Sequence, residues 1–171
     1  MMRSHNEVQG MVLKAARGAG VPLGHCEDLA AAMPDYIALG GDMGALVVAL
    51  NRPHQPWTNG HGCAVMAAPT AIDLVRADHG EQRIKRADLP LLVLALVSMA
   101  NRFGGGLACD VQGDCVAIGT GPGVSVVVPG GAVDVDGLAW AGLTKLAALT
   151  FVPETDASRA AGAGAGLSDN D

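Results

Sequence analysis

The sequence predicts an α+β fold, in which an N-terminal helical hairpin and a central helix pack on an antiparallel sheet. The first observation is a change of apolar period, from helical spacing before about Gly106 to strand-like alternation after it. The second is length, because 171 residues suit one domain, 1–171, with a Gly/Ala-rich C-terminal tail at 160–171. The third is composition: 50% of the residues are hydrophobic but only 3% are aromatic, so the core is expected to consist of Ala, Val, Leu and Met.

The N-terminal hairpin is predicted from two helices and the turn between them. Ser4 and Glu7 are spaced as a capping box at the start of the first helix. That helix is expected to stop in the sequence RGAG, where Gly18 and Gly20 can supply a left-handed C-cap. The second helix is expected to begin in VPLGHCEDLAAAM and to end at Pro34.

The middle of the chain is expected to contain three more helical segments. One starts at Asp42 and runs through MGALVVALN, before a Pro/Gly-rich loop, RPHQPWTNGHG. Another follows Pro69, and the charged run from Asp78 to Asp88 is expected to be a solvated loop or a helix end. The third, LPLLVLALVSMANRF, is the central helix, and GGG ends it.

The second half is expected to form strands in GLACDV, DCVAIG, GVSVVVP and AVDVDG, with turns at Gln112-Gly113, Gly121-Pro122 and Gly130-Gly131. A two-residue turn at Gln112-Gly113 pairs Asp110 with Cys115. One face of this hairpin then carries Leu107, Cys109, Val116 and Ile118. Cys109 and Cys115 point to opposite faces, which argues against a disulfide between them.

The last strand and the helix after it complete the predicted order. Asp134 and Asp136 alternate with valines, so these carboxylates are expected to face solvent or a site. LAWAGLTKLAALTF then returns to helical spacing.

Charge and composition exclude several classes of partner and compartment. The formal net charge of -6 disfavours nucleic acid and anionic membrane surfaces. The apolar run from Leu89 to Ala100 is too short to span a bilayer, and no secretory segment follows the N-terminus. The cysteines form no C-x-x-C pair, so reduced thiols and a cytoplasmic location are expected.

Two motifs that could bind a cofactor or metal are assigned to ordinary structure. GTGPG at 119–123 is followed by strand-like VSVVV rather than a helix, so a hairpin turn is expected instead of a phosphate loop. His54, His61 and Cys63 fall in one loop, but their spacing fits no standard zinc site. No metal and no cofactor are therefore predicted.

Two segments combine an arginine with glycines, KAARGAG near the start and SRAAGAGAG near the end. Arginine binds carboxylate or phosphate through a planar fork of donors, and glycine lets backbone amides approach a ligand or another chain closely. The candidate ligand-binding residues are Arg17, Gly18, Gly20, Ser158, Arg159, Gly162, Gly164 and Gly166. Ordinary helix capping at KAARGAG and a solvated tail at the C-terminus are the competing interpretations.

The two ends of the chain, KAARGAG and TFVPETDASRAAGAGAGLSDND, resemble a small bacterial family described as a domain of unknown function, number 3726. The resemblance covers both ends well and the middle loosely. It implies that Arg17, Ser158, Arg159 and the tail are important, without implying a reaction. Phe151 stands where Tyr is expected in the family, so the resemblance carries no phenolic hydroxyl to this position.

These observations lead to two hypotheses of function. In the first, the chain is a cytosolic binding or assembly subunit whose GAGAG tail docks in a groove of its own chain or on a partner. The partner is a second copy of the chain or another protein subunit. Asp169 and Asp171 would then need basic partners, for which Arg17 and Arg159 are the nominees. In the alternative, a small enzyme holds an anionic metabolite between Arg17 and Arg159, and an acid or histidine moves the proton.

Overall fold

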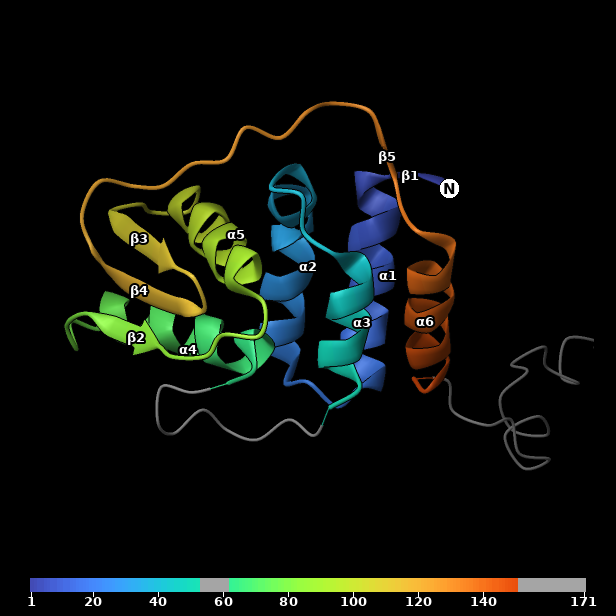
Figure 1. Ribbon diagram of the computed structural model, residues 1–171, viewed down its shortest axis with the longest axis horizontal. Coiled ribbons are helices and arrows are strands. Elements are labelled where there is room, and N and C mark those ends of the chain that lie inside the picture. Colours follow the sequence, from blue (N-terminus) through green and yellow to red (C-terminus); the bar gives the residue numbers. More distant parts are fainter. Residues whose placement is uncertain (53–61, 151–171) are drawn as a thin grey trace, which may run out of the picture.

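The computed structural model describes residues 1–52 and 62–150, and within them the chain forms six helices and two small antiparallel sheets (Figure 1). This confirms the predicted α+β class. The helices α1, α2, α3 and α6 stand together at one side of Figure 1, and α4, α5 and the larger sheet occupy the other.

The N-terminal hairpin is present as α1 (His5–Gly18) and α2 (Leu23–Ala38). The predicted capping box starts α1: the Glu7 amide donates to Ser4 Oγ at 3.2 Å, and the Ser4 amide donates to Glu7 Oε2 at 2.8 Å. Both bonds satisfy amides that have no partner inside the helix.

Pro34 does not end the second helix, contrary to the prediction. α2 continues through it to Ala38, and α4 (Ala64–Arg76) likewise contains Pro69 and begins before it. A proline removes one helical hydrogen bond. In α2 the residues that follow, Asp35 and Tyr36, are both fully packed in the core, so the burial of this last turn offsets the missing bond.

The remaining helices agree with the sequence. α3 (Met43–Leu50) is capped by Asp42, whose Oδ1 accepts from the Gly44 amide at 2.7 Å. α5 (Pro90–Asn101) is the central helix and is buried over most of its length. α6 (Gly137–Ala148) is capped by Asp136, whose Oδ2 accepts from the Ala139 amide at 2.8 Å.

The larger sheet has the strand order β2-β4-β3, from β2 (Gln82–Ile84), β3 (Leu107–Gln112) and β4 (Cys115–Thr120). The hairpin turn is Gly113-Asp114, so Asp110 pairs with Ala117 and not with Cys115 as predicted. Gly113 has φ +64, which favours glycine at this turn. Because the register differs by two residues, the predicted faces are unchanged, and Cys109 and Cys115 do point apart.

Two segments of this region differ from the prediction. The charged run from Asp78 to Asp88 contains β2, which pairs with β4 and buries Ile84 among exposed polar neighbours. Residues 123–129, expected to be a strand, join neither sheet and cross the top of the molecule in Figure 1. The amides of Val124 and Val126 instead donate to the Leu107 carbonyl at 3.3 Å and to Ser98 Oγ at 2.9 Å.

The second sheet joins the two ends of the described chain. β1 (Met2–Ser4) pairs antiparallel with β5 (Ala132–Asp134), and the N-terminal amino group contacts Asp134 Oδ1 at 2.6 Å. The helices that follow these strands, α1 and α6, lie side by side and point the same way (Figure 1). Their first turns therefore meet at one end of the molecule and their last turns at the other.

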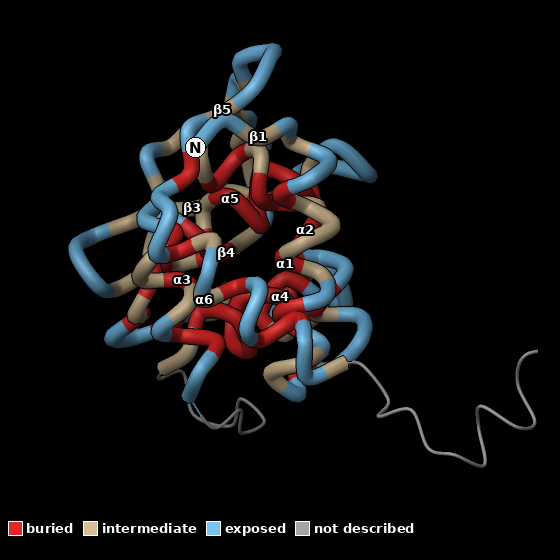
Figure 2. The backbone as a smooth tube through the Cα atoms, turned by 90° about the vertical axis from the view of Figure 1, so that its right-hand side faces the viewer, coloured by how far each residue is buried: buried red, intermediate tan, exposed pale blue. Residues whose placement is uncertain are grey.

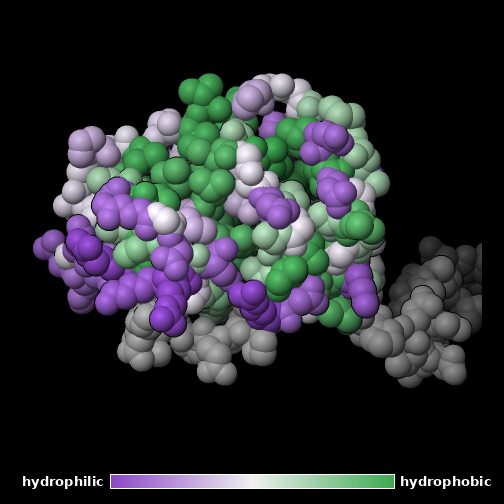
Figure 3. Space-filling model, viewed as in Figure 1, coloured by the Kyte–Doolittle hydropathy of each residue, from purple (hydrophilic) through white to green (hydrophobic). Residues whose placement is uncertain are grey.

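The core is built from small and aliphatic side chains, as the composition predicts. Buried segments gather on the inner sides of the helices and of β4 (Figure 2). Tyr36 is the largest fully buried side chain among the described residues, and its hydroxyl donates to the Asp42 carbonyl at 3.0 Å. On the face drawn in Figure 3, hydrophilic residues gather over the larger sheet.

Candidate functional site

Arg17, the first of the predicted site residues, lies in the last turn of α1. Its side chain is exposed, and its charge complements the carbonyl end of the helix. None of the ion pairs found in residues 1–52 and 62–150 involves Arg17. It is therefore a cation that the described structure leaves accessible to a ligand or to another segment of chain.

Gly18 lies directly against the backbone of α6. A Cβ atom at this position would come within 1.9 Å of the Leu146 carbonyl oxygen and 2.8 Å of the Leu146 carbonyl carbon. Glycine is required here for close approach of two helices, and its φ is not in the left-handed region. The expectation that Gly18 supplies a left-handed C-cap is thus wrong.

Gly20 does adopt the left-handed conformation, with φ +82. The Gly20 amide donates to the Arg17 carbonyl at 3.0 Å, and the Val21 amide donates to the Ala16 carbonyl at 3.0 Å. This pair of bonds is a Schellman motif and satisfies carbonyls at the end of α1. The capping interpretation of KAARGAG therefore holds at Gly20. Arg17 contributes only its backbone carbonyl to this cap, and its side chain takes no part in it.

The last turn of α1 contacts the last turn of α6 and leads into the first turn of α2. We call residues of these three turns the α1/α6 end: Arg17, Gly18, Gly20, Leu23 and Leu149. Leu23 and Leu149 are 57% and 68% exposed, so apolar surface accompanies the arginine. Pro22, the N-cap of α2, offers no side-chain acceptor to the first amides of that helix. The α1/α6 end thus combines positive potential from Arg17 and from the α2 dipole with two exposed leucines.

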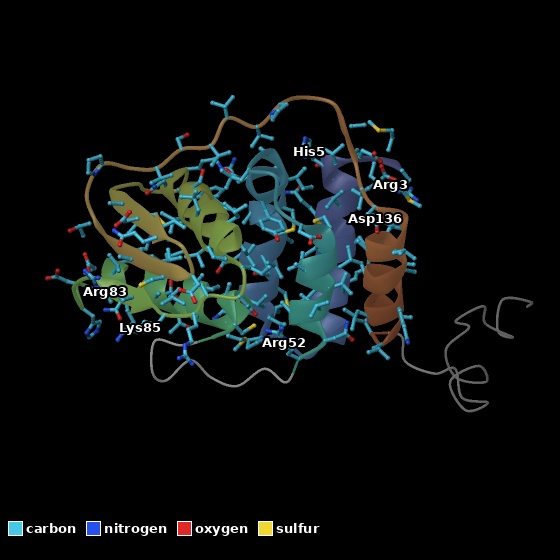
Figure 4. All side chains as sticks on the ribbon, in the orientation of Figure 1. Arg3, His5, Arg52, Arg83, Lys85 and Asp136 are labelled. Carbon is cyan, nitrogen blue, oxygen red and sulfur yellow. The ribbon has the colours of Figure 1, made fainter. Side chains whose placement is uncertain are left out.

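The opposite ends of the same two helices are fastened by other groups (Figure 4). The Arg3 guanidinium lies 4.5 Å from the centre of the Trp140 ring and contacts Glu7 at 3.2 Å. His5 Nε2 lies 3.1 Å from the Pro129 carbonyl oxygen. Asp136, predicted to face solvent or a site, caps α6, so this end is held together by its own contacts.

Several residues singled out in the sequence lie outside the described residues. These are Ser158, Arg159, Gly162, Gly164 and Gly166 of the predicted ligand site, Phe151, Leu167, Asp169 and Asp171 of the tail, and His54 and His61. Whether Arg17 and Arg159 converge therefore stays a prediction. Within the portion of the chain that is described, no group of three or more His, Cys, Asp or Glu is arranged to hold a metal ion.

Three of the cysteine thiols, those of Cys26, Cys63 and Cys109, lie in surroundings that disfavour the thiolate. All four are free. Burial raises the pKa of Cys26, against an opposing effect of Arg17, and the thiol donates to the Val21 carbonyl at 3.2 Å. Burial also raises the pKa of Cys63, and raises the pKa of Cys109 to about 12. Because the thiolate is the reactive form, these three positions are poorly suited to covalent catalysis.

A polar network in the core was not foreseen from the sequence. Asp35 of α2 is fully buried and accepts from Ser98 Oγ at 2.8 Å and from the Arg102 guanidinium. Ser98 Oγ in turn accepts from the Val126 amide, so the network ties α2, α5 and the crossing segment together. The sequence offered one signal of this network, an acidic residue and a serine on otherwise apolar helix faces. When such polar side chains are buried, they need hydrogen-bond partners.

Asn101, next to this network, fixes the two glycine-rich segments that follow α5 and β4. Its Nδ2 donates to the carbonyls of Leu107 and Val124, both at 2.9 Å, and its Oδ1 accepts from the Leu107 amide at 3.0 Å. Ser98, Asn101 and Arg102 also line a shallow cavity of about 340 Å³ with Gly105 and Gly123. The GTGPG sequence therefore opens no helix and turns the chain into the crossing segment, without forming the expected hairpin.

Residues 3–39 match the family model described as "Protein of unknown function (DUF3726)". The matched range comprises most of β1, all of α1 and α2, and the site residues Arg17, Gly18 and Gly20. This confirms the resemblance that was stated for the N-terminal end of the chain, and the match does not extend to the tail. Comparisons with curated proteins and with solved structures found no match.

None of the helices in residues 1–52 and 62–150 is both long and apolar enough to cross a bilayer.

Proposed function

We propose that the chain is a binding and assembly subunit whose C-terminal segment, residues 160–171, docks at the α1/α6 end of the same chain or of a second copy. The observation that carries the proposal is the close approach of Gly18 to the Leu146 carbonyl. It holds the end of α6, from which the chain continues toward this segment, against the last turn of α1, the turn that also carries the exposed Arg17.

The length of chain between α6 and the segment allows docking in cis. Thr150 is the last described residue, and nine residues, 151–159, separate it from position 160. Nine residues of extended chain span up to about 30 Å, which is the length of a 20-residue helix. The segment can therefore return to the α1/α6 end of its own molecule or reach that of a neighbour.

Charge and shape are complementary between the two surfaces. Asp169 and Asp171 supply negative charge, whereas the α1/α6 end carries Arg17 and the N-terminus of α2. Leu167 supplies one apolar side chain for the exposed Leu23 and Leu149. Because glycine has no Cβ, the alternating glycines at 162, 164 and 166 would let this segment approach another backbone closely.

The alternative function, an enzyme that holds an anionic metabolite between Arg17 and Arg159, has less support. Arg17 is exposed, and it does not line the cavities beside Asp28, Ser98 and Ala45 in the described part of the chain. Binding sites for small molecules are normally concave. An extended partner segment fits an exposed surface better than a metabolite does.

A double-mutant cycle on the full chain tests the proposal. The two changes are Arg17→Ala and the paired replacement Asp169→Asn/Asp171→Asn, each compared in urea unfolding with the parent and with the combined variant. Docking through these charges predicts a coupling free energy of about 0.5–1 kcal/mol, in the range measured for exposed ion pairs.

The matched control is Lys85→Ala, which removes an exposed positive charge on the larger-sheet side of the molecule, away from α6 (Figure 4). It is expected to show no coupling to the aspartate replacements. Light scattering of the same variants over a concentration series distinguishes the two modes, because docking onto a second copy makes the oligomer depend on Arg17. A coupling near zero together with an unchanged oligomeric state would rule the proposal out.

A further inference from the structure

A cleft lies between α2, α4 and α5, and it shares no lining residue with the α1/α6 end. It has a volume of about 260 Å³, and its floor is apolar. The floor comprises Pro69, Ile72, Leu96, Met99 and Ala100, all of which are buried. Such a floor can take the hydrocarbon part of a small ligand, and the polar groups around it determine which charge that ligand carries.

Two carboxylates, Asp28 of α2 and Asp73 of α4, stand on the rim of this cleft. In the described part of the chain neither side chain forms an ion pair or a hydrogen bond. Burial raises the pKa of Asp28 and the negative charge of Asp73 raises it further, whereas His25 and Arg76 lower it. The two carboxylates thus repel each other, and a cation bound at both would relieve this repulsion.

Arg76, the cation on the same rim, is engaged elsewhere. Its guanidinium donates to the Ala100 carbonyl at 2.8 Å, in the last turn of α5. The same carbonyl also accepts from the Phe103 amide at 3.1 Å. Arg76 therefore anchors the wall of the cleft, and although its charge offsets part of that of Asp28, it forms no ion pair with either carboxylate.

Phe103 supplies an aromatic surface at the end of the same wall. The residue lines the cleft and is 78% exposed, although it is one of only two phenylalanines in the sequence. A ligand that covers this ring would remove its apolar surface from water, which is favourable. The face of such a ring attracts an organic cation, so Phe103 and the two carboxylates favour the same class of ligand.

We propose that this cleft binds a small organic cation with an apolar body, whose ammonium group lies between Asp28 and Asp73 while its hydrocarbon part contacts the apolar floor and Phe103. The site uses no residue of the α1/α6 end, and its occupation does not depend on docking of the C-terminal segment.

The test is a calorimetric titration of the full chain with 2-phenylethylamine, compared with its neutral analogue 2-phenylethanol and with the anion 3-phenylpropionate. All three carry the same ring, so they separate charge from apolar contact. The amine is expected to bind saturably, the alcohol about tenfold more weakly because it lacks the charged hydrogen bonds, and the acid not at all.

Variants locate the binding in the cleft. Asp28→Asn and Asp73→Asn are each expected to lower the affinity for the amine by about tenfold, and Phe103→Ala by a few fold. All three positions are exposed, so these variants are expected to fold. Asp114→Asn, in the turn between β3 and β4, is the control with the same change in net charge, and it should bind the amine like the parent.

Three results would each overturn the proposal. They are equal affinity for amine and alcohol, unchanged affinity in both aspartate variants, and the absence of saturable amine binding to a chain that shows a normal cooperative melt.

Discussion

At the scale of single residues, Gly18 has the most demanding environment of the predicted site. It was selected for its backbone freedom, but its role is the absence of a side chain against the Leu146 carbonyl. Gly10 lies in the same helix, and a Cβ atom there would meet nothing within 4 Å. The two glycines of α1 therefore have opposite requirements, although nothing in the sequence distinguishes them.

We expect Gly18→Ala and Gly10→Ala to change stability in opposite directions. The alanine at 18 must push α1 and α6 apart, at a cost of about 1–3 kcal/mol typical of overpacking. The alanine at 10 fills open space and should stabilise the helix by about 0.5–1 kcal/mol. Thermal unfolding of both variants measures this, at roughly 2–4 °C for each kcal/mol in a chain of this size. A Gly18→Ala variant as stable as the parent would show that the two helices are not in close contact.

At the scale of elements, α2 and α5 are joined by a charged contact inside an apolar core. Asp35 is fully buried, whereas the side chain of Arg102 is 43% exposed. The pair therefore differs from the ion pair between Arg83 of β2 and Glu81, the residue before this strand. There both side chains are exposed, Arg83 to 62% and Glu81 to 51%. Removing the arginine has different consequences in the two cases, because only Asp35 would be left as an uncompensated buried charge.

Arg102→Ala is accordingly expected to lower the free energy of unfolding by on the order of 3 kcal/mol. The comparison variant, Arg83→Ala, should cost less than about 1 kcal/mol. Urea denaturation at neutral pH measures both. If the two variants lose the same small amount, Asp35 is not the buried partner that the structure indicates.

Much of the element order was predictable, and the errors have physical causes. The capping box at Ser4, the Asp42 cap and the apolar periods of α1, α3, α5 and α6 depend on nearby residues, which the sequence displays directly. Long-range pairing decides the rest. β1 and β2 are three-residue strands that exist because β5 and β4 lie beside them, and residues 123–129 have strand composition without a neighbouring strand to pair with.

The candidate site was predictable to a smaller extent. Arg17 and Gly20 could be selected from a short glycine-rich string, because capping chemistry is local. The contact of Gly18 with α6 joins residues far apart in the chain, as do the Asp35 network and the cleft carboxylates Asp28 and Asp73. Such groups are recognised only once the helices are placed side by side.

At the scale of the whole molecule, the two halves of the chain are fastened at both ends of the α1–α6 pair. The β1–β5 ladder joins the first turns of these helices, and Gly18 joins the last turns. The chain therefore continues past Thr150 from a fixed place against the last turn of α1. If residues 160–171 dock, this geometry predicts that they do so at the α1/α6 end of the molecule.

The most direct measurement is a comparison of backbone amide NMR spectra of the full chain and of a chain that ends at Arg159. Docking predicts chemical-shift differences concentrated at residues 17–24 and 146–150, and the same pattern should diminish in Arg17→Ala. Differences restricted to the residues adjoining the new C-terminus, with the amides around Arg17 and Leu149 unchanged, would contradict the account.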